Sequence, residues 1–268
     1  MKVFQYLLFC ITLLTFTSCV YNNLNRNHYL MSPDESLSLT LHGDQHNISY
    51  SLTKNGNTLI NQSKLGIVAD QFEFANDIQI KNVTRSSNNT TWTQVWGEQK
   101  QIVDHHNELA IHVTSNSNDI QMIIRFRLFN DGLGFRYEIP EHTELNEFKV
   151  LDELTEFNFA EDATSWWIPA YSYRRFEFLY ANTLISEISR DTYSKLVENL
   201  NGPRLGPEAV HSPFTVQRTD GICIAIHEAN LTNYSSMTLK ADGTTKMECD
   251  LIPWSDCLLY TSPSPRDS

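Results

Sequence analysis

Apolar and polar residues alternate in short runs along most of the chain, which is the pattern of strands with one buried face. Such runs lie at 36–41, 48–52, 58–60, 71–74, 78–83, 91–96 and 109–114. The sequence Lys-Asn-Gly-Asn at 54–57 is typical of a tight hairpin turn. Helical periodicity is limited to 191–200, which Asn-Gly-Pro closes. The pattern predicts an all-β fold of two packed antiparallel sheets with few short helices.

The clearest single element is a hairpin in the sequence QMIIRFRLFNDGLGFRYEIP, residues 121–140. Ile124 and Phe126 point to one side of the first strand, while Arg125 and Arg127 point to the other. After a turn at 130–134, the same alternation resumes in the second strand. We expect the apolar face to lie in the core and the arginines to pair with acidic residues on adjacent strands.

A second kind of strand is indicated at 222–227, where Asp-Gly precedes the run Ile-Cys-Ile-Ala-Ile-His. This run is apolar without alternation. Continuous apolar character is typical of a strand that is covered on both faces. We therefore expect this strand to lie inside the fold.

Composition is that of an ordered globular protein. The chain has 268 residues, of which 41% are hydrophobic and 19% are charged. This length suits one large domain or two small ones, and an all-β sandwich can occupy it as a single unit. Its 20 basic and 32 acidic residues give a net charge of −12. Such a charge repels phosphate backbones, which argues against nucleic acid as a partner.

The N-terminal residues 1–19 have the features of a secretory signal peptide. Lys2 precedes an apolar run from Val3 to Phe16, which is too short for a membrane span. Thr-Ser-Cys at 17–19 resembles a bacterial lipobox, in which Cys19 is lipidated. Phe16 departs from the usual residue there, so ordinary signal cleavage is the alternative. We expect an exported protein of the periplasm or outer membrane, anchored by lipid through a polar tether at 20–31.

Two cysteines remain for the folded part of the chain, Cys223 and Cys249. They could form a disulfide in an oxidising compartment, or they could be two buried free thiols. No CxxC or Cys/His spacing indicates a metal site.

Two histidine-containing sequences look like metal ligands but fail on spacing. His105 and His106 are adjacent, and adjacent residues on a strand face opposite sides, so we expect polar residues at a loop edge. His227-Glu228 resembles half of the HExxH motif, but Leu231 stands where the second histidine belongs. The sequence has no GxSxG motif and no glycine loop for phosphate.

Aromatic residues concentrate in SWWIPAYSYRRFEFLY, residues 165–180. Trp and Tyr rings can stack on a sugar, and Glu177 among them could hold a cation or a hydroxyl group. Large aromatic residues also dominate ordinary cores. Composition alone favours that second interpretation.

Five stretches resemble the N-terminal region of glycoside hydrolase family 97. They are SPDESLSLTL at 32–41, VWGEQKQIVDHHNELAI at 95–111, IIRFRLFNDGLGFRYEIP at 123–140, WWIPAYSY at 166–173 and IAIHEANLTNYSSMTL at 224–239. They are collinear, and with the regions between them they cover 32–256. The resemblance implies an N-terminal antiparallel β-super-sandwich of the galactose-mutarotase type, followed by a (β/α)8 barrel and a small β domain.

The resemblance also implies an activity and a metal. Members are exo-acting α-glucosidases or α-galactosidases with calcium at the active site, and their substrates are oligosaccharides or other α-glycosides. One glutamate of the N-terminal domain reaches that ion, and the motif places it at Glu177, with Glu187 as a second candidate. Both catalytic carboxyl groups come from the barrel, so we expect no catalytic residue here and no activity from this chain alone.

The tail at 257–268 does not continue the resemblance. Cys257 to Asp267 resembles the translation of a transposase sequencing adapter, so we expect it to carry no selected structure and the barrel to be encoded beyond Asp256 in the parent gene. The alternative is a non-catalytic, lipid-anchored β-sandwich that binds carbohydrate or another partner.

Overall fold

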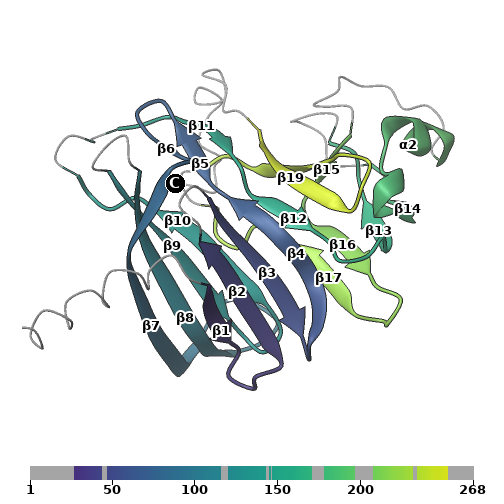
Figure 1. Cartoon of the computed structure of the whole chain (residues 1–268). Helices are drawn as coiled ribbons and strands as arrows, with labels where there is room; N and C mark the ends of the chain where they lie inside the picture. Colours follow the sequence, from purple (N-terminus) through teal and green to yellow (C-terminus); the bar gives the residue numbers. More distant parts are fainter. Residues whose placement is uncertain are drawn as a thin grey trace, which may run out of the picture.

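The computed structural model describes residues 27–43, 47–115, 120–142, 145, 147–170, 178–196, 208–231 and 234–252. Strands make up almost all of the regular structure (Figure 1). The helices in this part of the chain are the 3-10 helix η1 (Ile185–Glu187) and α2 (Arg190–Leu196). Helix α2 confirms the helix predicted from residue 191, and residues 197–200 lie outside the described part.

The first sheet has the strand order β1-β2-β3-β4 and is antiparallel throughout. Its strands are β1 (His28–Met31), β2 (Leu37–Gly43), β3 (Ile48–Lys54) and β4 (Asn57–Leu65). Lys54 pairs with Asn57, and the two residues between them both have positive φ, Asn55 at 50° and Gly56 at 81°. This is the tight turn that the sequence predicts.

The second sheet has the order β10-β9-β8-β7. Its strands are β7 (Ile78–Thr93), β8 (Gln101–Ser115), β9 (Gln121–Leu128) and β10 (Leu133–Glu138). The predicted hairpin is confirmed, with Phe126 opposite Phe135. The Phe135 ring also packs at 5.8 Å from that of Tyr50 in β3, so the two sheets share one core. The sandwich predicted from the alternating pattern is therefore present.

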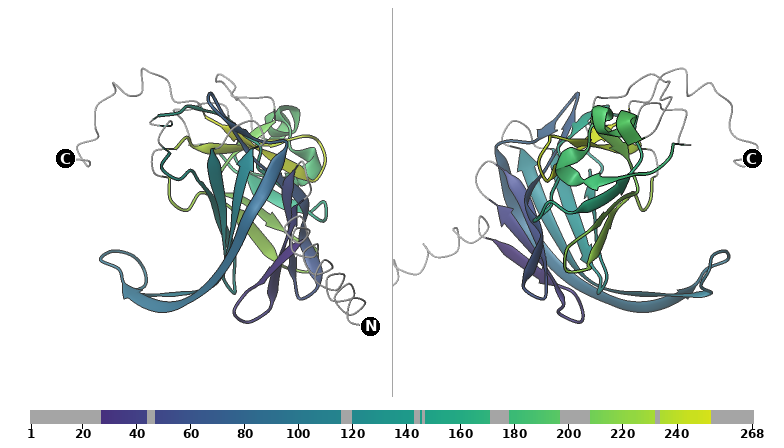
Figure 2. Two further views of the ribbon diagram at one scale, coloured as in Figure 1. Left: turned by 60° about the vertical axis from the view of Figure 1, so that its left-hand side comes forward. Right: turned by 90° about the vertical axis from the view of Figure 1, so that its right-hand side faces the viewer.

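Strands β7 and β8 extend beyond their sheet. Strand β9 pairs with β8 only over Asn107–Thr114, whereas β7 pairs with β8 as far as Thr93 opposite Gln101. Residues 88–93 and 101–106 thus form a two-stranded ribbon. Both views of Figure 2 show this ribbon curling away from the β1–β4 sheet. The separate strands predicted at 78–83 and 91–96 are one strand of 16 residues, Ile78–Thr93, and residues 94–96 lie beyond its end.

Three smaller sheets complete the fold, with orders β11-β5-β6, β12-β19-β18-β15 and β14-β13-β16-β17. Their strands are β5 (Ile67–Ala69), β6 (Glu73–Phe74), β11 (Val150–Glu153), β12 (Glu156–Asn158), β13 (Thr164–Trp167), β14 (Ala181–Leu184), β15 (Ala209–His211), β16 (Phe214–Gln217), β17 (Cys223–Ile226), β18 (Met237–Ala241) and β19 (Lys246–Leu251). Their apolar residues join the same buried cluster as those of the larger sheets. The all-β super-sandwich that the resemblance implies is confirmed.

The prediction that the strand at 222–227 is covered on both faces is wrong. Strand β17 lies at the edge of its sheet, with Cys223 and Ala225 exposed and Ile224 and Ile226 half-buried against the core. An apolar run does not distinguish a central strand from an edge strand when the outward residues are as small as Cys and Ala. Cys223 and Cys249 are both free thiols, and Cys249 alone is buried. No helix in the described ranges is long and apolar enough to cross a membrane.

Candidate functional site

The predicted calcium ligand lies in the connection between β13 and β14. These strands are antiparallel partners, with Trp167 opposite Ala181, so the chain leaves and re-enters one hairpin there. Residues 171–177 of the connection, Glu177 included, lie outside the described part. The prediction for Glu177 therefore stays a prediction, and the structure describes the residues on either side of the connection.

Both ends of that connection are firmly held. The buried Trp167 donates its indole Nε1–H to Thr183 Oγ1 at 3.0 Å and packs on the ring of Tyr193 at 5.5 Å. The Tyr193 hydroxyl donates to the carbonyl oxygen of Leu179 at 2.9 Å, on the returning side. On the outgoing side, the amide of Ala170 donates to the carbonyl oxygen of Ala209 at 2.9 Å. Trp167 of the aromatic run thus serves the core, as composition indicates, whereas Trp166 is half-buried.

The second candidate, Glu187, has a different local role. It is exposed in η1, and its Oε2 accepts the backbone N–H of Leu184 at 3.2 Å. That bond satisfies an amide at the start of the helix, as an N-terminal cap does. Among the described residues, no three His, Cys, Asp or Glu side chains are grouped so that they could hold a metal ion.

His105 and His106 lie within β8, so the expectation of a loop edge is wrong, because β7 and β8 are longer than their sequence pattern indicates. Their side chains face opposite sides of the strand, as predicted. His106 is buried, and its Nδ1 lies 2.6 Å from Asp104 Oδ1. Its ring packs at 5.0 Å from Phe129. The contacts of His106 with Asp104 and Phe129 stabilise the ribbon where it joins the sheet.

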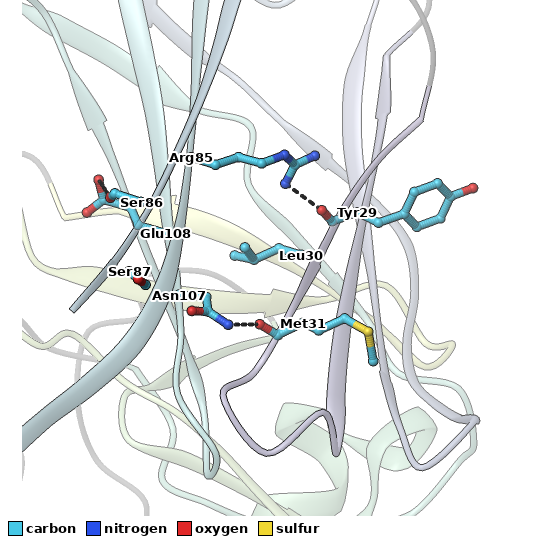
Figure 3. A pocket seen from close by; sticks show the side chains of 8 residues that line it. All are labelled: Tyr29, Leu30, Met31, Arg85, Ser86, Ser87, Asn107 and Glu108. Carbon is cyan, nitrogen blue, oxygen red and sulfur yellow. Dashed lines mark hydrogen bonds between the residues drawn. The ribbon is translucent and has the colours of Figure 1, made fainter. Parts of the chain in front are cut away.

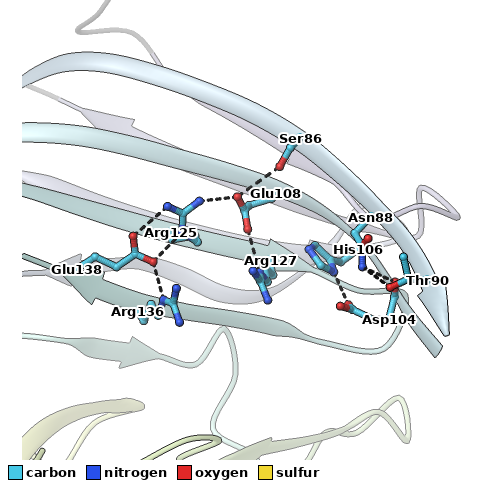
Figure 4. Close-up of polar contacts among 10 residues, drawn as sticks. All are labelled: Ser86, Asn88, Thr90, Asp104, His106, Glu108, Arg125, Arg127, Arg136 and Glu138. Atoms are coloured by element: carbon cyan, nitrogen blue, oxygen red, sulfur yellow. Dashed lines mark hydrogen bonds and ion pairs between the residues drawn. The ribbon is translucent and has the colours of Figure 1, made fainter. Parts of the chain in front are cut away.

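The arginines of the hairpin form an ionic ladder across the outer face of the second sheet (Figure 4). Arg125 donates to Glu108 at 2.6 Å and, through two nitrogens, to Glu138 at 2.7 and 2.9 Å. Arg127 donates to the other oxygen of Glu108 at 2.9 Å, and Arg136 donates to Glu138 at 2.6 Å. The predicted pairing with acidic neighbours is confirmed.

The ladder changes the acidity of its carboxyl groups. Hydrogen bonds from Arg125 lower the pKa of Glu138 to about 2. Burial raises the pKa of Glu108, but hydrogen bonds from Arg127 and Arg125 outweigh burial and hold it below its ordinary value. Both carboxyl groups are therefore ionised at neutral pH, which suits them to hold arginines and not to donate protons.

A second polar network lies between β11, β12 and the residues before β18. The Tyr234 hydroxyl donates to Glu153 Oε2 at 2.5 Å, and Thr155 Oγ1 donates to Oε1 at 2.7 Å. Tyr137 bonds Thr155 at 2.8 Å and accepts the amide of Gly66 at 3.0 Å. Burial raises the pKa of the Glu153 carboxyl. Each group here has a partner within the fold, so the network joins three sheets.

Glu228, from the failed HExxH match, is a structural acceptor. Its Oε1 accepts the amide of Met237 at 2.7 Å, and its Oε2 accepts the Ser212 hydroxyl at 3.3 Å. His227 is exposed and directs Nδ1 at the carbonyl oxygen of Glu228, 3.1 Å away. The arrangement does not resemble a zinc site. Neither this glutamate nor the Glu153 network is signalled by local pattern, because their partners are distant or follow irregular loops.

An open hollow of about 400 Å³ lies between β1 and the β7–β8 pair (Figure 3). Two polar side chains that line the hollow donate hydrogen bonds to the backbone of β1. Arg85 Nη1 donates to the carbonyl oxygen of Tyr29 at 2.6 Å, and Asn107 Nδ2 donates to that of Met31 at 2.8 Å. The hollow thus fastens an edge strand to the opposite sheet and offers few converging polar groups to a ligand.

A comparison with protein families gives the same result as the fold and the sequence motifs. The family model described as "Glycosyl-hydrolase 97 N-terminal" matches residues 30–256. The chain belongs to glycoside hydrolase family 97. The resemblance stated from the sequence motifs is therefore confirmed.

Relatives with known names or structures support this membership. A retaining alpha-galactosidase of Bacteroides thetaiotaomicron is 23% identical over 260 residues, which is 95% of this chain and 36% of the relative. A family 97 enzyme from Pseudoalteromonas sp. strain K8, solved in complex with acarbose, is 34% identical with a TM-score of 0.73. The match covers 85% of this chain and 32% of that one. A beta-arabinopyranosidase structure, 19% identical with a TM-score of 0.71, shares the fold over 85% of this chain and 36% of its own.

This family 97 chain spans about a third of the length of these relatives. The Bacteroides enzyme and the Pseudoalteromonas enzyme each have roughly two thirds of their polypeptide outside the matched region. The described residues accordingly build a domain of a glycoside hydrolase family.

Proposed function

We propose that this chain is the N-terminal domain of an exported, calcium-dependent α-glycosidase that removes terminal α-linked glucose or galactose from oligosaccharides. The domain packs on a catalytic (β/α)8 barrel and supplies Glu177 as one ligand of a calcium ion shared with that barrel. The observation that carries the proposal is the family match over residues 30–256, in a chain about a third as long as its relatives.

The relatives' names support the substrate class. One is called a retaining alpha-galactosidase, and the Pseudoalteromonas enzyme was solved with acarbose and, as a variant, with panose. Glycosidic cleavage needs two carboxyl groups that flank the scissile bond. We place both in the barrel, so the present domain contributes metal binding, carbohydrate contacts and packing, and is inactive alone.

The fit of a carboxylate to calcium supports the role of Glu177. Calcium is a hard cation that takes six to eight oxygen ligands, and a carboxylate is its commonest protein ligand. The held ends of the β13–β14 connection, at Ala170 and Leu179, restrict where the residues between them can reach. A ligand delivered across a domain boundary needs such an anchor, because a freely moving loop loses conformational entropy when it binds.

The test restores the barrel to the parent enzyme and compares Glu177→Gln with Glu187→Gln. We expect hydrolysis of a chromogenic α-glucoside or α-galactoside that a chelator abolishes and calcium restores. Glu177→Gln should raise the calcium concentration for half-maximal activity by roughly 10- to 100-fold, as loss of a metal-site interaction does. Glu187→Gln, whose carboxylate caps η1, should leave it unchanged.

Three results would count against the proposal. An unchanged calcium requirement in Glu177→Gln would show that Glu177 is not a calcium ligand. Activity that persists in the presence of a chelator would show that the enzyme does not depend on calcium. An intact parent that binds oligosaccharides but cleaves no glycoside would favour the alternative, a non-catalytic binding module.

Export and anchoring form the remaining part of the proposal. The apolar run before Cys19 and the Thr-Ser-Cys sequence support a lipid-anchored protein of the periplasm or outer membrane. Metabolic labelling with a fatty acid should mark the wild-type protein and not Cys19→Ala, and Cys10→Ala serves as the control. A labelled Cys19→Ala protein, or an unlabelled wild type in the soluble periplasm, would contradict lipidation.

A further inference from the structure

The ribbon at the end of β7 and β8 is built unlike the rest of the sandwich. Residues 88–106, which we call the β7–β8 arm, comprise the two paired segments and the turn between them. Within the described residues, the arm's strands pair only with each other. An isolated two-stranded ribbon is marginally stable in water. The arm therefore gains little from its own sheet beyond the base braced by His106 and Asp104.

The arm carries large apolar side chains into solvent. Val95 is 90% exposed, Trp96 87%, Val103 63% and Trp92 52%. Single exposed apolar residues are ordinary, but Trp92, Val95 and Trp96 lie together at and beside the tip of a protruding ribbon, which marks an interaction surface. Val103 pairs with Thr91 and lies on the opposite side of the ribbon from Trp92. Tryptophan is among the residues most enriched at the energetic centres of protein interfaces.

The curvature of the arm extends this surface onto the outer face of the second sheet. Alternate residues of a strand share a face, so Trp92 and its partner Ile102 lie on the same side as Glu108. The ribbon curls away from the β1–β4 sheet, so this side is the inside of the curve (Figure 2). The ladder of Arg125, Arg127 and their carboxylates forms its floor (Figure 4).

We propose that the inside of this curve is the surface on which the rest of the parent polypeptide docks, with the arm's tryptophans clasping the catalytic barrel. The inference rests on the proposed function for the identity of its partner. The matched family region is N-terminal, and about two thirds of each relative lies outside it. A partner joined through the same chain is present at high effective concentration, so a modest apolar clasp is sufficient.

Charge supports a protein partner that is not strongly ionic. The floor pairs its arginines with Glu108 and Glu138, so it is nearly balanced on a chain whose net charge is −12. A balanced, hydrogen-bonded floor with aromatic residues at its margin suits a mixed protein surface. A sugar site would instead need polar groups converging on a hollow, and the described hollow between β1 and β7–β8 lacks the arm's tryptophans.

The test is amide hydrogen exchange in the 268-residue chain and in the parent enzyme with its barrel restored. Amides at 88–106 should exchange at least about tenfold more slowly in the monomeric parent than in the chain alone, because docking holds the arm closed. The double variant Trp92→Ser/Trp96→Ser should abolish that difference. Tyr29→Ser, which removes an aromatic side chain that is 58% exposed on β1, should preserve it.

Exchange in the buried strand β9 checks that each variant remains folded. Equal exchange of the arm in both proteins overturns the proposal. Protection that disappears on dilution would show that the arm binds a second copy of the protein. Protection that requires added oligosaccharide would show that the arm binds the substrate. Either result also overturns the proposal. Glycosidase activity is measured on the same samples, so an inactive parent with a protected arm refutes the proposed function alone.

Discussion

At the scale of single residues, Glu108 is the centre of the ionic ladder. Its two oxygens accept hydrogen bonds from Arg125 at 2.6 Å and from Arg127 at 2.9 Å. Only 12% of its side chain is exposed, so the bonds are partly shielded from water. Losing the charge leaves two neighbouring guanidinium groups on one face without their shared partner.

We therefore expect Glu108→Gln to lower the free energy of unfolding by about 1 to 3 kcal/mol, the usual worth of hydrogen bonds to charged groups. Urea denaturation at neutral pH measures it. Glu141→Gln, an exposed carboxylate in the segment after β10, is the matched control and should change stability by less than about 0.5 kcal/mol. Equal effects of the two substitutions would show that the ladder is only a surface feature.

Glu138 makes the same ladder sensitive to acid. Its pKa is lowered to about 2 by hydrogen bonds from Arg125, so the ionised form is favoured in the folded state. A depressed pKa contributes stability above the unfolded pKa, near 4.5, and that contribution is lost as pH falls towards 2. The contribution is at most about 3 kcal/mol.

The stability difference between the wild type and Glu138→Gln should thus be largest near neutral pH and shrink between pH 4.5 and 2. Denaturation curves of both proteins at several pH values measure this difference. A difference that does not depend on pH would mean that the carboxylate acts through packing and not through its charge.

Prediction from sequence works at this scale where partners share a regular pattern. Arg125 and Arg127 alternate with core residues, so their outward position and acidic partners follow from the strand alone. Glu153 and Tyr234 are 81 positions apart and meet at 2.5 Å only because three sheets converge. No local signal in the sequence marks such a pair.

At the scale of elements, the strands that flank the predicted metal ligand in the sequence are β13 and β14. Thr183 Oγ1 accepts the buried indole N–H of Trp167 and donates to the carbonyl oxygen of Leu184 at 2.8 Å. Removing this hydroxyl leaves a buried donor without an acceptor, which costs about 1 to 3 kcal/mol.

Thr183→Val should therefore destabilise the domain by that amount, measured by chemical denaturation, and should loosen the ends of the connection. In the parent enzyme it should also raise the calcium concentration for half-maximal activity, as Glu177→Gln does, but by a smaller factor. Thr215→Val in β16, at a half-exposed position, is the matched control. If the Thr183→Val protein is as stable as the wild type and needs the same calcium concentration, this hairpin does not influence calcium binding.

The elements show why boundaries are harder to predict than strand identity. Alternation locates most strands, yet β7 and β8 continue through polar Asn, Thr and His residues that carry no apolar signal. Pairing with each other sustains them, and pairing partners are not visible in one sequence. For this reason the sequence pattern predicts no arm and places its tryptophans in a separate strand at 91–96.

At the scale of the molecule, an all-β class follows from pattern, whereas assignment to family 97 follows from collinear motifs and is confirmed by the family match over 30–256. The functional site is harder to predict, either from the pattern or from the motifs. The resemblance alone indicates Glu177, which lies outside the described residues, so its role stays a prediction. A domain that contributes one ligand leaves no cluster for sequence or structure to detect.

The behaviour of the chain in solution depends on its exposed apolar side chains. These are the tryptophans of the arm, together with Leu179 and Tyr180 at the β13–β14 connection, and the proposed docking would cover those of the arm. Burying such side chains is favourable by about 25 cal/mol per Å². Opposing this, a net charge of −12 keeps copies apart at low ionic strength, and salt screens that repulsion.

We expect the 268-residue chain to self-associate, with oligomers that grow with protein concentration and with salt. Light scattering at low and high salt measures the average mass. Trp92→Ser/Trp96→Ser should lower it, Tyr29→Ser should not, and the parent with its barrel should stay monomeric under the same conditions. A chain that remains a monomer at high salt and high concentration would mean that these apolar side chains are tolerated in water, and that the barrel is not required to cover them.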